Sequence, residues 1–73
     1  MTYPRIILAL SRFDVATVED IAEATSSNKR TTWTHLQAAV AHGHATREGS
    51  RGQVAKYQIT DAGRAVVRER RAA

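Results

Sequence analysis

The chain has 73 residues, which is enough for one small domain and too few for a second core. It contains no cysteine, which excludes disulfides and thiolate metal sites, and its apolar run Ile6 to Leu10 is far too short to span a membrane. Eleven Lys or Arg against seven Asp or Glu give a net charge of +4, and a basic surface commonly serves a polyanion. A folded cytoplasmic protein without a signal peptide is therefore expected; the plain alternative is that the arginines only aid solubility.

A first helix is predicted from about Pro4 to Ser11, because proline favours the first turn of a helix. Residues Ile6 to Leu10 are apolar on every side of this helix. One face can pack on the following helices, so the opposite face must be buried against something else. A second copy of the chain is one candidate, which predicts a homodimer through Pro4 to Leu10 and the C-terminal helix. Phe13, Val15 and the C-terminal helix of the same chain are the other.

Two short helices around a polar turn are predicted next, as in a helix-turn-helix. Thr17 and Asp20 have the spacing of a capping box, which begins the first of them. Either Ser27 or Asn28 caps the second, which runs from about Lys29 to His42 and ends at the glycine that follows.

The second helix of this pair has two unlike faces. Around Leu36, helical spacing gathers an apolar stripe that faces the core. Trp33 lies at its edge and is expected to fill the rim of the core, the other interpretation being that it reaches toward DNA. The opposite side is small, polar and free of carboxylates, which favours a nucleic-acid groove, and its members are Arg30, Thr31, Thr34, Ala38 and Ala41, with His35 and Gln37 at the flanks.

Positive charge is concentrated in the later part of the chain. Residues 29–73 hold nine Lys or Arg against three Asp or Glu, whereas residues 1–28 hold two against four. Five basic side chains are expected to converge on one surface: Lys29, Arg30, Arg47, Arg51 and Lys56.

After the second helix the pattern changes to the alternation of strands. Runs at His44 to Arg47 and Val54 to Ile59 predict a β-hairpin, with Arg51 at its tip. Thr60 is expected to cap a last helix from about Asp61. That helix is predicted to turn Ala62, Ala65 and Val66 inward, and residues 70–73 are expected to fray.

This order of elements is that of a winged helix-turn-helix, an α+β fold that is mostly α, with a three-helix core, a two-stranded β-hairpin wing and a C-terminal helix. Residues 17–48, TVEDIAEATSSNKRTTWTHLQAAVAHGHATRE, and residues 56–66, KYQITDAGRAV, resemble the DNA-binding domains of bacterial MarR, ArsR, PadR and IclR-type regulators. The resemblance covers about residues 15–67, and residues 1–73 are expected to form a single such domain. The chain departs from the pattern at Thr25, Ser27, Thr32 and His44, where those regulators usually carry Leu or Ile.

Double-stranded DNA is the partner that these patterns predict. A helix whose amino-terminal side chains touch base edges fits the major groove, and an arginine on a slim wing fits a narrow minor groove. Arg30 is the candidate for guanine, and Thr31 or Thr34 for a thymine methyl or a phosphate. The predicted DNA-binding residues are Thr17, Ser26, Asn28, Lys29, Arg30, Thr31, Thr34, His35, Gln37, Arg47, Arg51, Gln53 and Lys56.

No catalytic constellation is visible, so an enzyme is not expected. No cofactor and no metal are expected either, because His35, His42 and His44 lack the further ligands of a zinc site. The alternative is that these histidines bind a transition metal in a metal sensor. The expected function is transcriptional regulation in a bacterium, phage or mobile element, at the nucleoid. The alternatives are a protein-interaction module and an accessory factor in recombination or replication.

Overall fold

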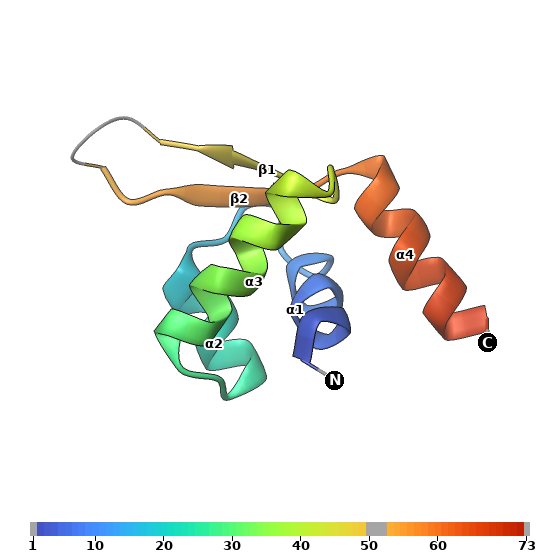
Figure 1. Cartoon of the computed structure of the whole chain (residues 1–73), viewed down its shortest axis with the longest axis horizontal. Helices are drawn as coiled ribbons and strands as arrows, with labels where there is room; N and C mark the ends of the chain where they lie inside the picture. Colours follow the sequence, from blue (N-terminus) through green and yellow to red (C-terminus); the bar gives the residue numbers. More distant parts are fainter. Residues whose placement is uncertain (1, 50–52, 73) are drawn as a thin grey trace.

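The computed structural model describes residues 2–49 and 53–72. Four helices and a two-stranded hairpin follow one another along the chain, as the sequence predicts (Figure 1). Their bounds are α1 Thr2–Leu10, α2 Val18–Thr25, α3 Lys29–Ala41, β1 Ala45–Glu48, β2 Lys56–Ile59 and α4 Asp61–Ala72.

Capping side chains set the ends of α2 and α3. Thr17 Oγ1 accepts a hydrogen bond from the backbone N–H of Asp20, and a carboxylate oxygen of Asp20 accepts from the N–H of Thr17, both at 3.1 Å. This is the predicted capping box. Of the two candidates for the next cap, Asn28 is the one used: its Oδ1 accepts from the N–H of Thr31 at 2.7 Å. After α3, Gly43 takes a φ of +77°, the left-handed conformation that glycine adopts without steric cost.

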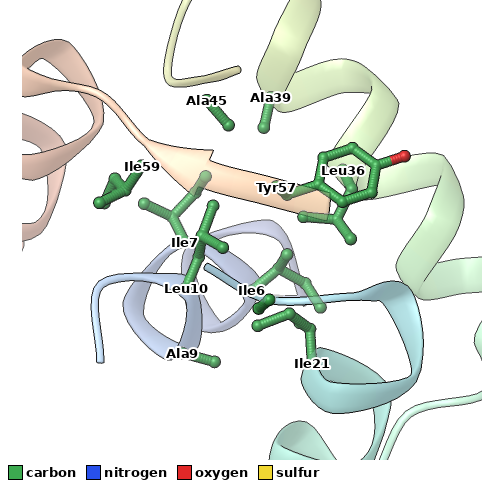
Figure 2. Close-up of a cluster of buried hydrophobic side chains, with 11 residues drawn as sticks. Ile6, Ile7, Ala9, Leu10, Ile21, Leu36, Ala39, Ala45, Tyr57 and Ile59 are labelled. Carbon is green, nitrogen blue, oxygen red and sulfur yellow. The ribbon is translucent and has the colours of Figure 1, made fainter. Parts of the chain in front are cut away.

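The core lies where α1, α2, α3 and the hairpin meet (Figure 2). Ile6, Ile7 and Leu10 of α1 are fully buried, together with Ile21 of α2 and Leu36 of α3. The Tyr57 ring of β2 is also fully buried in this cluster and lies beside Leu36 (Figure 2). One chain thus buries most of the apolar α1 helix.

The hairpin is joined to the rest of the domain by a bridge that the sequence did not reveal. Ala16 and Tyr57 exchange two backbone hydrogen bonds, of 2.9 and 2.7 Å, in an isolated antiparallel bridge. Tyr57 lies in β2, so the segment before α2 acts as a third strand one residue pair long. This bridge fixes the hairpin against the start of the helix-turn-helix.

Some predicted details are wrong. Val15 is 47% exposed and does not cover α1, and Ala62 is exposed while Val67 packs on the core instead. Helix α1 begins at Thr2, since proline is tolerated anywhere in a first helical turn. Strand β1 begins after His44 because the N–H of His44 closes the end of α3 on the carbonyl of Ala39, at 2.8 Å.

Candidate nucleic-acid interface

The amino end of α3 presents two cationic side chains to solvent. Lys29 and Arg30 occupy its first two positions, and both are exposed. The Asn28 side chain accepts from the N–H of Thr31 and its carbonyl accepts from the N–H of Thr32, so the earlier N–H groups of the first turn remain available. The helix dipole adds partial positive charge there. This end of the helix can therefore attract an anion and offer hydrogen-bond donors to it.

Thr34 lies one turn further along the exposed face. Its hydroxyl donates to the carbonyl of Arg30 at 3.0 Å, so its hydrogen is already used within the helix. What Thr34 presents outward is a methyl group and the lone pairs of Oγ1, which fits a thymine methyl or a base amino group better than a phosphate. Farther along, Ala38 is half-buried and Ala41 exposed, so the face remains small.

The one ion pair among the described residues joins the two helices of the motif. Lys29 Nζ lies 3.0 Å from a carboxylate oxygen of Glu19 in α2, and both side chains are about 70% exposed. Ten residues separate the pair in the sequence, and only the packing of α2 against α3 brings them together. Lys29 is therefore partly neutralised in the free protein.

The two residues predicted at the flanks of the α3 face are held by neighbouring elements. Gln37 Nε2 donates to the hydroxyl of Tyr57 at 2.8 Å, which links α3 to β2. His35 lies on the α1 side, with its ring centroid 6.0 Å from that of Tyr3. Both side chains therefore help position α3 within the domain.

The side chains of the other two histidines, His42 and His44, also lie near Tyr3. Its hydroxyl shares a 2.7 Å hydrogen bond with Nδ1 of His44, and the His42 ring lies 6.1 Å from it, centroid to centroid. Burial raises the pKa of Tyr3 above its ordinary value, which keeps the hydroxyl neutral. Within residues 2–49 and 53–72, no three or more His, Asp or Glu side chains are arranged to hold a metal ion.

Register places the basic residues of the hairpin on opposite faces. Arg47 pairs with Tyr57, whereas Lys56 pairs with Glu48, and directly paired residues in antiparallel strands share a face. Arg47 therefore leaves the hairpin on the side of α3, and Lys56 leaves it on the other side next to a carboxylate. The expectation that these bases converge on one surface is wrong for Lys56.

The remaining predicted residues fall in three places. Thr17 caps α2 and is half-buried, while Ser26 is exposed at the turn of the motif with a left-handed φ of 55°. Gln53 is exposed beside the hairpin and lines a shallow hollow there with Glu48 and Val54. Arg51, predicted at the tip of the wing, lies outside the described residues.

Trp33 is not part of the core. Its side chain is 52% exposed, so the interpretation that it fills the rim of the core is wrong. Leu36 and the Tyr57 ring already fill that space, and Trp33 is left in a cleft between α3, the start of α2 and the hairpin. On the helical wheel Trp33 stands about 60° from Leu36, a position too close to the apolar stripe to predict exposure.

The helix-turn-helix, the hairpin that follows it and the helix packed behind them define a winged-helix domain. Solved structures of similar fold include YusO of Bacillus subtilis (TM-score 0.85, 17% identity, 96% of this chain and 51% of that one). A MarR-family transcriptional regulator of Silicibacter pomeroyi is also similar (TM-score 0.83, 24% identity, 92% and 46%), as is BpsR of Bordetella bronchiseptica (TM-score 0.84, 21% identity, 92% and 48%).

At these identities the likeness extends to the fold, which is the winged-helix fold of MarR-type regulators. The chain spans about half the length of the solved structures it matches. No protein-family model matches the sequence, and no curated protein matches it either. Among the residues that the structure describes, no helix has the length and apolar character needed to cross a membrane.

Proposed function

We propose that this chain binds double-stranded DNA as the DNA-binding part of a transcriptional regulator, with α3 in the major groove and the hairpin at the neighbouring minor groove. The observation that carries the proposal is the amino end of α3, where Lys29, Arg30 and Thr34 stand on a small exposed face. The helix itself contributes no carboxylate to this face, and the one carboxylate beside it, that of Glu19 in α2, is paired with Lys29. Winged-helix neighbours that are named as transcriptional regulators support the regulatory role. Such a protein would work at the nucleoid, in the cytoplasm.

The hairpin supports the same orientation. Its strands run toward the side where α3 begins, and α4 lies at the opposite end of the domain (Figure 1). A helix in one groove and a hairpin at the next is the docking geometry expected of this arrangement. Arg30 would then contact base edges, whereas Arg47 would contact phosphates, and Arg51 would follow at the tip of the wing.

The proposal includes a homodimer. A groove between α1 and α4 is lined mainly by apolar side chains, those of Pro4, Ile7, Leu8, Val66 and Val67, with Arg5 and Arg70 at its edges. Covering this groove with a second copy would enlarge the core, which is small because the chain is short. Two-fold symmetry would then require an inverted-repeat site with half-sites one helical turn, or a multiple of it, apart.

The test compares Arg30→Ala with Arg47→Ala by fluorescence anisotropy, using labelled duplexes selected by the protein from a random pool. Arg30→Ala should cost about 1 to 3 kcal/mol of binding free energy on the selected site and flatten the preference at one base pair. Arg47→Ala should weaken all sequences alike and reduce the salt slope by about one, because a phosphate contact carries no sequence information. With about four phosphates neutralised per protomer, the wild-type slope should be roughly −3 to −4.

Lys56→Ala is the matched control, because Lys56 leaves the hairpin on the far face beside Glu48. This variant should lose less affinity for duplex DNA than Arg47→Ala. If wild-type protein binds no duplex at about 50 mM salt, a condition that favours charge contacts, the DNA proposal fails. A protein-interaction module that uses the polar face of α3 then takes its place.

A further inference from the structure

An apolar cleft separates the recognition helix α3 from the hairpin. Trp33 of α3 forms one wall, and Val54 and Ala55, just before β2, form the other. Trp33 is 52% exposed and Val54 70%, so two large apolar side chains face solvent at the mouth of the cleft. Exposed apolar surface gathered in one place is typical of a contact site.

Charged and polar groups surround this apolar surface. Lys29 and Arg47 line the cleft from the two sides, and Thr17 lines it where α2 begins. Arg47 shares the face of Tyr57, which is the face of the hairpin turned toward α3. Glu19 lines the cleft too, and the 3.0 Å ion pair with Lys29 offsets its charge. The cleft therefore offers an apolar floor with the Arg47 cation on one side and the Lys29–Glu19 ion pair on the other.

DNA geometry decides what would pass through such a cleft. If α3 occupies a major groove and the hairpin meets the adjoining minor groove, the sugar-phosphate strand that divides the two grooves must cross between them. That strand is complementary to the cleft, because its deoxyriboses are largely apolar and its phosphates are anionic. This step rests on the proposed function.

We propose that Trp33 is a backbone-contacting residue, packing its indole ring against a deoxyribose of the strand that crosses this cleft and donating its Nε1–H to a neighbouring phosphate. Tryptophan combines a large apolar body with a single donor, so it can satisfy both parts of that strand at once. The half of its surface that the fold leaves in water would be covered on binding. Lys29 and Arg47 would neutralise the phosphates on either side.

Because the contact is to sugar and phosphate, its loss should be the same for every sequence. Trp33→Ala should weaken binding to selected and random duplexes alike, by about tenfold, while base preference is unchanged. Trp33→Phe keeps an apolar ring and loses the donor, so its loss should be smaller. Val15→Ala is the matched control, since Val15 is 47% exposed and does not line the cleft. It lines a different hollow, with Thr46, Glu48 and Gln58, which borders the cleft only at Arg47.

The chain contains one tryptophan, so its emission reports on Trp33 alone. Titration with an unlabelled selected duplex should shift the emission of wild-type protein to shorter wavelength, as the ring leaves water. Anisotropy of the labelled duplex measures binding independently of this signal, and circular dichroism establishes that each variant is folded.

The outcomes separate the inference from the proposed function. A shift in emission together with a uniform loss in Trp33→Ala supports the backbone contact. Duplex binding with unchanged emission, or with full affinity in folded Trp33→Ala, overturns it and leaves DNA binding intact. A loss confined to one base pair also overturns it, because Trp33 would then be reading a base. If the wild-type protein binds no duplex, both the backbone contact of Trp33 and the proposed DNA-binding function are wrong.

Discussion

Gly63 is the residue that lets α4 approach the rest of the domain. It is buried, and a Cβ built there would overlap the carbonyl oxygen of His44 and lie 2.6 Å from Cγ1 of Ile59. The helix is capped just before this point, where Thr60 Oγ1 accepts from the N–H of Gly63 at 3.1 Å and donates to the carbonyl of Gly43 at 2.6 Å. Gly63 is therefore required by close backbone packing.

Gly63→Ala is predicted to destabilise the domain by about 2 kcal/mol or more, because backbone atoms and a buried side chain must shift to make room. Gly43→Ala makes a useful comparison: no atom lies within 4 Å of its Cβ position, so it should cost only about 1 kcal/mol for the left-handed φ. Urea unfolding followed by circular dichroism measures both. Equal stability of Gly63→Ala and wild type would contradict the packing account.

At the scale of elements, α2 and α3 are joined at the surface by the Glu19 to Lys29 ion pair. An exposed pair of this kind contributes little to folding, about 0 to 1 kcal/mol, so its main effect is on the charge that α3 presents. In the proposed complex, Glu19 would stand beside a phosphate, where like charges repel.

Glu19→Gln is accordingly predicted to raise duplex affinity about threefold, since it frees Lys29 and removes the repulsion, with little change in the midpoint of thermal unfolding. Anisotropy titrations at low and high salt check this, and the gain should shrink as salt increases. Glu23→Gln removes the same charge from an exposed position of α2 outside the cleft. An equal gain in that variant would mean that only net charge matters.

At the scale of the whole molecule, the apolar groove between α1 and α4 lies away from the start of α3 and from the wing (Figure 1). A second copy docked there would leave both proposed DNA-contacting elements free. Leu8 lines the groove and is half-buried, so it is the natural position at which to introduce a charge.

Wild-type protein is predicted to sediment at micromolar concentration with twice the 8.0 kDa mass of the chain, and Leu8→Glu to sediment as a monomer. Val15→Glu, which introduces the same charge at an exposed apolar position elsewhere, should remain dimeric. A wild-type species of 8.0 kDa alone would count against the dimer, and binding to DNA as cooperative monomers would replace it.

Local chemistry alone determined the order of the elements and the starts of α2, α3 and α4. Thr17 with Asp20, Asn28 and Thr60 are caps whose partners lie three residues away, so their pattern can be read directly from the sequence. Alternation along Val54 to Ile59 likewise predicted a strand there. The observed strand β2 is shorter, Lys56–Ile59, and buries Tyr57 and Ile59 on one face. The cationic first turn of α3 follows from the same local reading.

Contacts between distant segments were decided only by the tertiary structure. The Ala16 to Tyr57 bridge, the Gln37 to Tyr57 hydrogen bond and the Glu19 to Lys29 ion pair each join elements whose separation in sequence carries no periodic signal. Strand register put Arg47 and Lys56 on opposite faces, and the space taken by Leu36 and Tyr57 left Trp33 in solvent. Helical and strand periodicity indicate which face of an element is apolar. Which of the apolar side chains fill the core depends on how the packed elements share the space between them.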